Sequence, residues 1–199
     1  MRAVRDGVWH WRAPHPEWKP DEDWGKQVSS YAIDDGNRVL LFDPLAVPGE
    51  IEEIMDGRET AIVLTCPWHR RDAIALADRL GAPLYVPPPD AGDPDPVPGR
   101  VFAAGDTLPV GVEAFAGMEP NDLVLWVPSR AAVVTGDTLV DRGRGLEFPA
   151  EWADKGVPAA EILAGLQTLL DLPVEVVLPT HGAPTDRAAL EHALSERVA

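Results

Sequence analysis

The chain has few cysteines, few basic residues and no long apolar run, and each shortage excludes a class of protein. A single cysteine, Cys66, excludes an internal disulfide framework and fits a reducing compartment. Lysine and arginine number 17 against 33 aspartates and glutamates, which gives a formal net charge of −16. A field of that sign repels the phosphates of nucleic acids and of anionic membranes, so we expect neither as a partner.

No apolar stretch approaches the ~20 residues that span a bilayer. The first twelve residues are charged and lack the apolar core of a signal peptide. We therefore expect a cytoplasmic protein. With 199 residues, 45% of them hydrophobic, the chain suffices for one packed core. We expect one domain over residues 1–199, with a Trp-rich arm (residues 1–25) packed on it.

Hydrophobic periodicity predicts an alternation of strands and helices. Strands are predicted at 26–34, 37–45, 60–65, 84–86, 100–103, 106–110, 112–117, 122–127, 131–136 and 174–179, and helices at 48–57, 70–81, 158–172 and 184–198. Asp35-Gly36 between the first two strands predicts a hairpin, and residues 141–148 read as a loop. Two mixed halves, each with strands inside and helices outside, predict a layered α/β/β/α sandwich.

Chemically active side chains gather in three stretches that follow apolar strands: TCPWHRRD (65–72), TGDTLVD (135–141) and LPTHGAP (178–184). Strand ends that converge on one edge of a sheet are the usual sites of α/β proteins. The candidates in these stretches are Cys66, His69, Asp72, Asp137 and His181. Thiolate, imidazole and carboxylate are ligands suited to zinc or a similar divalent ion.

At these stretches the chain resembles the metallo-β-lactamase fold superfamily. YAIDDGNRVLLFDP (31–44) resembles the family's opening hairpin, FAGMEPNDLVLWVPSRAAVVTGD (115–137) its central hairpin, and LPTHGAP its last metal-binding turn. The order and spacing of these pieces extend the resemblance over nearly the whole chain. It implies an α/β protein with the four-layer α/β/β/α sandwich of that family, and a hydrolase-like function.

The family's metal motif is altered in this chain. Family hydrolases carry Thr-His-x-His-x-Asp-His after the buried strand and a further histidine in the central hairpin. The corresponding positions hold Cys66, Trp68, Arg70 and Arg71 in the loop and Met118 in the hairpin. Of the expected ligands, Asp137 and His181 match plainly. Tryptophan and arginine do not ligate metals, and a thioether is a poor ligand, so the usual binuclear zinc site is excluded.

A smaller site remains open, because a shift of one residue brings His69 and Asp72 close to two lost ligand positions. His69, Asp72, Asp137 and His181, with Cys66 as a substitute, would then hold one zinc, iron or manganese ion. Three protein ligands and a water suffice for hydrolysis. We would expect a small anionic ester, thioester or lactone as substrate. β-Lactam hydrolysis is not expected, because the ligand set is wrong and no export signal is present.

Four arginines fall near the same mouth in the family's fold: Arg70, Arg71, Arg142 and Arg144. Such a local positive patch could hold an anionic substrate against the field of the whole chain. Each arginine could equally pair with one of the many nearby carboxylates.

The alternative is a pseudo-enzyme without metal. Arg70 or Arg71 would then neutralise Asp137, since a guanidinium replaces the charge of a metal without its chemistry. His181 would remain as a hydrogen-bonded histidine, and the ancestral cleft would bind a small anion or a protein partner. Cys66 could also act as a nucleophile beside His69, although a lone buried cysteine more often only packs.

Overall fold

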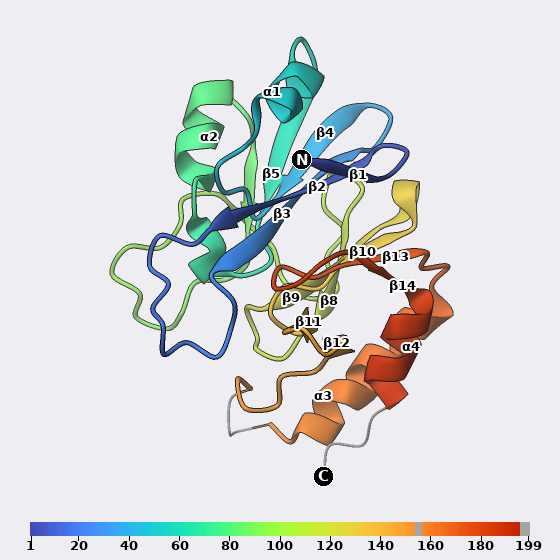
Figure 1. Ribbon diagram of the computed structural model, residues 1–199. Coiled ribbons are helices and arrows are strands. Elements are labelled where there is room, and N and C mark those ends of the chain that lie inside the picture. Colours follow the sequence, from blue (N-terminus) through green and yellow to red (C-terminus); the bar gives the residue numbers. More distant parts are fainter. Residues whose placement is uncertain (154–156, 196–199) are drawn as a thin grey trace.

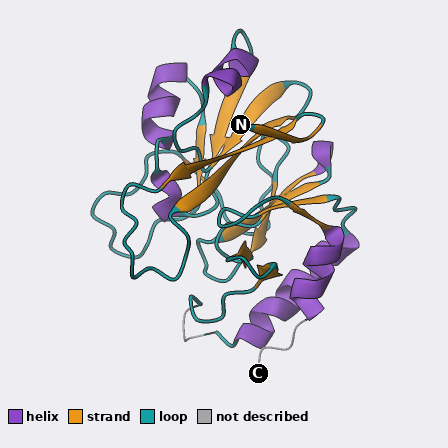
Figure 2. Cartoon of the chain, in the orientation of Figure 1, coloured by secondary structure: helices purple, strands orange, loops and turns teal. Residues whose placement is uncertain are grey.

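The computed structural model describes residues 1–153 and 157–195. In this part of the chain two large β-sheets lie face to face, and a pair of helices covers the outer face of each (Figures 1 and 2). The four-layer α/β/β/α sandwich predicted from the sequence is therefore confirmed.

The first sheet is built by the N-terminal half of the chain. In the order in which they pair, its strands are β1 (Arg2–Arg5), β2 (Val8–Pro14), β3 (Gln27–Asp34), β4 (Arg38–Phe42), β5 (Glu59–Val63), β6 (Leu84–Val86) and β7 (Arg100–Val101). The strands from β1 to β4 pair antiparallel, and those from β4 to β7 pair parallel. The helices α1 (Gly49–Met55) and α2 (Ala73–Leu80) connect parallel strands and cover the outer face.

The second sheet comes from the C-terminal half. Its strands, in order of pairing, are β14 (Thr185–Asp186), β13 (Val176–Leu178), β10 (Ala132–Val134), β9 (Leu123–Val127) and β8 (Glu113–Ala116). The helices α3 (Ala159–Leu166) and α4 (Arg187–Ser195) pack on its outer face, and β11 (Val140–Asp141) and β12 (Leu146–Glu147) form a small ribbon. Short 3-10 turns occupy Pro67–Arg70, Pro128–Arg130 and Gln167–Asp171.

The central strands are buried on both faces, and alternate side chains enter different parts of the core. In β4, Leu40 and Phe42 lie between the sheets, whereas Val39 and Leu41 face α1 and α2. In β9, Trp126 faces α3 and α4 while its neighbours point between the sheets. Burial on both faces fixes the register of these strands, and therefore the positions of the loops that follow them.

Four predicted segments differ from the structure. The arm expected at residues 1–25 begins as β1 and β2, which extend the first sheet beyond β3. Residues 106–110 form no strand, and only Thr107 makes a bridge there, to Glu113. Residues 141–148, expected to be a loop, include most of the β11–β12 ribbon. The last predicted helix begins at Arg187, and its residues 196–198 lie outside the described part of the chain.

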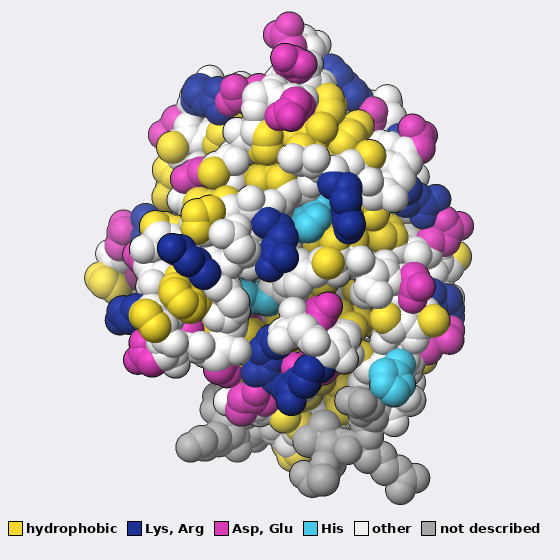
Figure 3. All heavy atoms as spheres, in the orientation of Figure 1, with side chains coloured by type: hydrophobic (Ala, Val, Ile, Leu, Met, Phe, Trp, Pro, Cys, Tyr) yellow, Lys and Arg dark blue, Asp and Glu magenta, His cyan; other side chains and the backbone are white. Residues whose placement is uncertain are grey.

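The surface carries charges of both signs. In the lower part of the face in Figure 3, basic side chains lie beside acidic ones. Among the described residues, no helix has the length and apolar character needed to cross a membrane.

Candidate metal centre

The candidate centre lies where parallel strands of both sheets end. In the first sheet, Asp43 follows β4 and the loop from Thr65 to Asp72 follows β5. In the second sheet, Asp137 follows β10 and His181 follows the neighbouring β13. Carboxyl ends of parallel strands share an edge of their sheet, and the two edges face each other across the sandwich.

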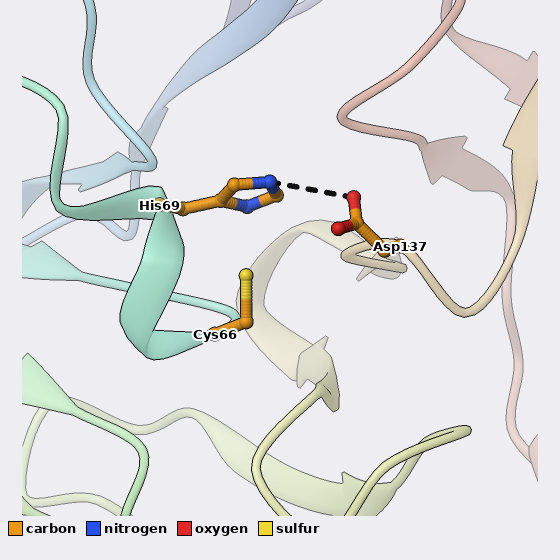
Figure 4. A group of neighbouring side chains, drawn as sticks. All are labelled: Cys66, His69 and Asp137. Atoms are coloured by element: carbon orange, nitrogen blue, oxygen red, sulfur yellow. Dashed lines mark ion pairs between the residues drawn. The ribbon is translucent and has the colours of Figure 1, made fainter. Parts of the chain in front are cut away.

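Cys66, His69 and Asp137 form a buried cluster in which one ligand atom of each residue lies within 4.8 Å of the others. The 3-10 turn Pro67–Arg70 carries the His69 ring back over Cys66, and the ring points across the gap at Asp137 (Figure 4). His69 Nε2 lies 3.3 Å from Asp137 Oδ1. A thiol, an imidazole and a carboxylate therefore converge from two separate sheets.

His69 is held in place from behind by two residues. Its Nδ1 lies 3.1 Å from the Thr65 hydroxyl and 3.3 Å from Asp43 Oδ2. Asp43 in turn accepts hydrogen bonds from the Thr65 amide (2.9 Å) and hydroxyl (2.6 Å). A carboxylate behind a histidine fixes the orientation of the ring and raises its basicity, as it does for metal-bound histidines.

Asp137 receives donors from four directions. Besides His69, the Trp68 indole Nε1–H donates to Oδ2 at 2.8 Å. The Thr180 hydroxyl shares its one proton between the Gly136 carbonyl at 2.8 Å and Oδ1 at 3.3 Å. His181 Nε2 lies 3.3 Å from Oδ1. Burial alone would raise the pKa of Asp137, but the positive charge of His69 and the hydrogen bonds from both histidines outweigh it and hold this pKa well below the ordinary value.

The pKa values of the other two members of the cluster, His69 and Cys66, are also shifted. Burial lowers the pKa of His69, but the Asp137 carboxylate outweighs it and raises this pKa to about 9. Burial and the nearby carboxylates raise the pKa of the Cys66 thiol well above its usual value. A divalent ion would displace both protons. The donor set suits zinc. His181 turns Nε2 toward Asp137, and its Nδ1 is buried without a hydrogen-bond partner, as are Nε and Nη2 of Arg71.

Of the residues predicted to ligate metal, Asp72 lies apart from the cluster. Its Oδ2 accepts a hydrogen bond from the Ala46 amide at 2.7 Å, and its own amide donates to the Pro44 carbonyl at 3.1 Å. The cause is the backbone of Arg71, whose φ of 34° turns the chain before α2 begins. Cys66, predicted only as a possible substitute, lies in the cluster with His69 and Asp137. His181, also predicted as a ligand, lies beside the cluster, with Nε2 near Asp137.

Of the four arginines predicted to bind an anion, three pair with carboxylates and Arg71 bonds to carbonyls. Arg70 pairs with Asp95 at 3.1 Å at the surface, and Arg71 Nη1 donates to the carbonyls of Ser29 and Asp43. Arg142 and Arg144 both pair with Glu147, and Arg142 also with Glu151 and Asp23. The charges that face Asp137 are therefore those of histidines, and the predicted pairing of Asp137 with Arg70 or Arg71 is wrong.

Three contributors escaped the sequence analysis. Trp68, dismissed as a lost ligand, donates to Asp137, and Asp43 orients His69. Asp122 is buried behind the cluster, where its carboxylate accepts from the Thr138 hydroxyl (2.5 Å) and the Asp137 amide (3.2 Å). Burial and the charge of Asp137 raise the pKa of Asp122 to about 8. The signal for both aspartates was their position: Asp43 follows the apolar run 39–42 of β4, and Asp122 precedes the apolar β9.

The cluster opens into a cavity of about 660 Å³. Aromatic walls are supplied by Trp24, Trp68 and Trp152. Trp24 and Trp152 pack against His181 in T-shaped contacts, with ring centroids 5.0 and 5.6 Å away. His69, Asp137 and His181 lie in the wall of the same cavity. A small molecule in it would therefore contact the cluster directly.

Comparisons of sequence and of structure gave different results. No protein-family model matches the chain, and a search of curated proteins finds no match. Among solved structures, a metallo-beta-lactamase from Erythrobacter litoralis with beta-mercaptoethanol in the active site superposes with a TM-score of 0.70 at 14% identity, covering 97% of this chain and 93% of that one.

Two further solved structures give the same result. A metallo-beta-lactamase from Pontibacter korlensis matches with a TM-score of 0.68 at 16% identity, over 98% of this chain and 96% of that one. The metallo-beta-lactamase FIM-1 from Pseudomonas aeruginosa, in its mono-zinc form, matches with a TM-score of 0.66 at 16% identity, over 96% and 91%. The chain therefore has the metallo-β-lactamase fold, as its sequence predicted.

Proposed function

We propose that this protein is a hydrolase that works with one divalent metal ion held by Cys66, His69 and Asp137. The observation that carries the proposal is the convergence of a thiol, an imidazole and a carboxylate within 4.8 Å at a cavity wall. A similar fold in its mono-zinc form, FIM-1, supports a single ion. The thiol favours zinc over harder ions such as manganese.

The chain's own residues have distinct roles in this proposal. A bound divalent ion supplies Lewis acidity, which polarises a carbonyl and lowers the pKa of water. Asp43 and Thr65 hold the imidazole of His69 in one orientation. Trp68 fixes the carboxylate of Asp137 through its indole N–H. An ester, thioester or lactone fits the proposal, since each offers an activated carbonyl.

A second candidate rests on the donors around Asp137. Without metal, the Trp68 N–H and a protonated His69 already satisfy this carboxylate. The protein would then be a non-catalytic binder that uses the same cavity. The two candidates differ in metal content, which is directly measurable.

The first test is metal content, by mass spectrometry on untagged protein purified without chelator. The expected result is about one equivalent of metal in the wild type and none in Cys66→Ala, since one of three ligands is missing. Asp72→Asn is the matched control, because Asp72 lies outside the cluster and asparagine keeps the oxygen that Ala46 uses. Circular dichroism confirms folding of each variant.

Two outcomes would contradict the proposal. One is wild-type protein that carries no metal and takes up none from added zinc, iron or manganese. The other is a loss of metal in Asp72→Asn as large as in Cys66→Ala, which would show that metal binds elsewhere.

A further inference from the structure

The walls of the cavity are acidic. Besides Asp137, five carboxylates line it: Glu17, Glu22, Asp23, Asp90 and Glu119. Among the described lining residues, Arg71 is the one with a permanent positive charge. Asp23 is partly neutralised by Arg142, whose Nη1 lies 3.3 Å away. The balance still favours a positively charged guest, because charges of one sign in a cleft reinforce each other.

Arg71 offers little to an anion in this cavity. Its Nη1 donates to the carbonyls of Ser29 (2.9 Å) and Asp43 (2.7 Å). Its Nε and Nη2 are buried from solvent and have no hydrogen-bond partner. The guanidinium therefore supports the loop that carries Asp43 and presents no accessible N–H to a guest.

The aromatic walls are arranged to suit a cation as well. Each indole N–H donates to a carboxylate: Trp24 to Glu22 at 3.1 Å, Trp152 to Asp23 at 2.6 Å, and Trp68 to Asp137 at 2.8 Å. These bonds fix the orientation of the rings and increase the electron density on their faces. An indole face attracts cations, and one face of Trp152 is already occupied by the Arg142 guanidinium, 5.3 Å from the ring centroid.

His181 adds an acceptor to the same wall. Its Nε2 faces Asp137, so in the neutral ring the proton lies on Nε2 and Nδ1 is an acceptor. Nδ1 is buried with no hydrogen-bond partner. The lone pair on this nitrogen adds to the negative potential of the wall, although a fully alkylated ammonium has no N–H to donate to it.

We propose that the cavity binds an organic cation, an alkylated ammonium group, against the faces of its tryptophans. Binding of the cation stands on the cavity alone, whereas its role as part of a substrate rests on the proposed hydrolase function. The sequence favoured an anionic substrate because four arginines fall near the mouth. The structure pairs three of them with carboxylates and commits Arg71 to carbonyls, which leaves the acidic and aromatic walls to select the guest.

The test uses three small molecules of one shape and three charges: choline, its uncharged isostere 3,3-dimethylbutan-1-ol, and 3,3-dimethylbutanoate. Isothermal titration calorimetry on the full chain measures each affinity, with the Trp indole N–H signals in NMR locating the site. We expect choline to bind about tenfold more tightly than the alcohol. The carboxylate should bind most weakly.

A pair of variants separates the cavity from the charge of the whole molecule. Glu22→Gln removes a wall charge but keeps an acceptor for Trp24, and should weaken choline binding severalfold. Glu53→Gln removes one exposed charge from α1, which lies on the outer face of the sheet, and should leave binding unchanged. Equal binding of choline and the alcohol, tighter binding of the carboxylate, or equal effects of the two variants would each overturn the inference.

The result is independent of metal content. Choline has no basic nitrogen with which to ligate a metal, and the hydroxyl it carries is shared with its uncharged isostere. Protein that holds metal but does not prefer choline disproves only the cation inference. Protein that prefers choline but holds no metal disproves only the hydrolase proposal.

Discussion

Some backbone positions beside the candidate centre do not tolerate a side chain, and Gly136 is the clearest example. It has φ +55°, and a Cβ there would lie 2.4 Å from Asp122 Oδ1 and 3.1 Å from the Thr65 Cβ. Hydrogen bonds from the Asp137 amide and the Thr138 hydroxyl hold the Asp122 carboxylate in this position. We expect Gly136→Ala to lower the free energy of unfolding by about 3 kcal/mol, the sum of left-handed strain and a buried clash.

A second glycine separates the two causes of destabilisation, the backbone strain and the buried clash. Gly57 has a similar φ of +68°, but no atom lies within 4 Å of its Cβ position. Gly57→Ala should therefore show only the backbone strain, about 1 kcal/mol. Urea unfolding of both variants measures the difference, and equal losses would show that the centre yields to an added methyl group.

At the same scale, the sequence could predict some members of the centre but not their partners. Cys66, Asp137 and His181 directly follow apolar strands, so their place at the sheet edge follows from the pattern. Asp72 also lies in such a loop, yet the positive φ of Arg71 turns it away. Arginine is rarely found in that conformation, so no residue in the loop indicates the turn.

Between elements, one ion pair ties the end of β3 to the turn before β5. Asp34 accepts two hydrogen bonds from Arg58, at 2.7 and 2.8 Å. These bonds lower the pKa of Asp34 from 3.8 to about 2. A lowering of this size corresponds to a contribution of about 2 kcal/mol to the free energy of unfolding. Because the pair is partly exposed, solvent screening reduces this contribution to about 1 kcal/mol.

The pH dependence of this pair has a definite sign. A carboxylate whose pKa is lowered by folding stabilises the native state above its unfolded pKa, and loses that effect as the pH falls toward its folded pKa. Asp34→Asn, which keeps the bond to the Gly36 amide, should cost about 1 kcal/mol at pH 7. The difference in free energy of unfolding between this variant and the wild type should become smaller as the pH falls from about 4 to about 2. Denaturant unfolding across this range checks it, with the exposed Asp78→Asn on α2 as control, and a gap that widens toward low pH would contradict it.

Strands and helices could be predicted where the local sequence pattern determines the structure. They could not be predicted where pairing with a distant strand determines it. The apolar β9 and the apolar second half of β5 are recognisable by composition alone. β1 and β2 exist because β3 offers them an edge, with Tyr31 opposite His10, and no local pattern contains that edge. The reverse holds at 106–110, where Pro109 and Gly111 interrupt a β-rich run and leave one bridge.

For the molecule as a whole, the charge of the cavity agrees with the charge of the chain. A net charge of −16 attracts a cation from a distance, and the acidic cavity wall then retains it. The sign of the wall could not be predicted from sequence, since Asp23 meets Trp152 only in the fold. Counting arginines near the mouth indicated the opposite sign, because their carboxylate partners are equally distant in sequence.

The two halves of the molecule also meet at the candidate centre, which gives a metal ion a mechanical role. Cys66 and His69 belong to the first sheet's loops and Asp137 to the second's. An ion bound to all three stabilises only the folded state, by about 2.7 kcal/mol at a free concentration one hundred times its dissociation constant. For a chain of this size we expect zinc to raise the melting temperature by about 5–10 °C, and a chelator to reverse the rise.

Scanning calorimetry of the wild type and two variants tests this link between the halves. Cys66→Ala should melt at the same temperature with and without zinc, because its site lacks the thiolate. Asp72→Asn should keep the full rise, because Asp72 is bonded to the Ala46 amide away from the cluster. A rise in Cys66→Ala as large as in the wild type would mean that zinc stabilises the fold from another place. No rise in the wild type would leave the pairing of His69 with Asp137, not a metal, as the link between the two halves at this centre.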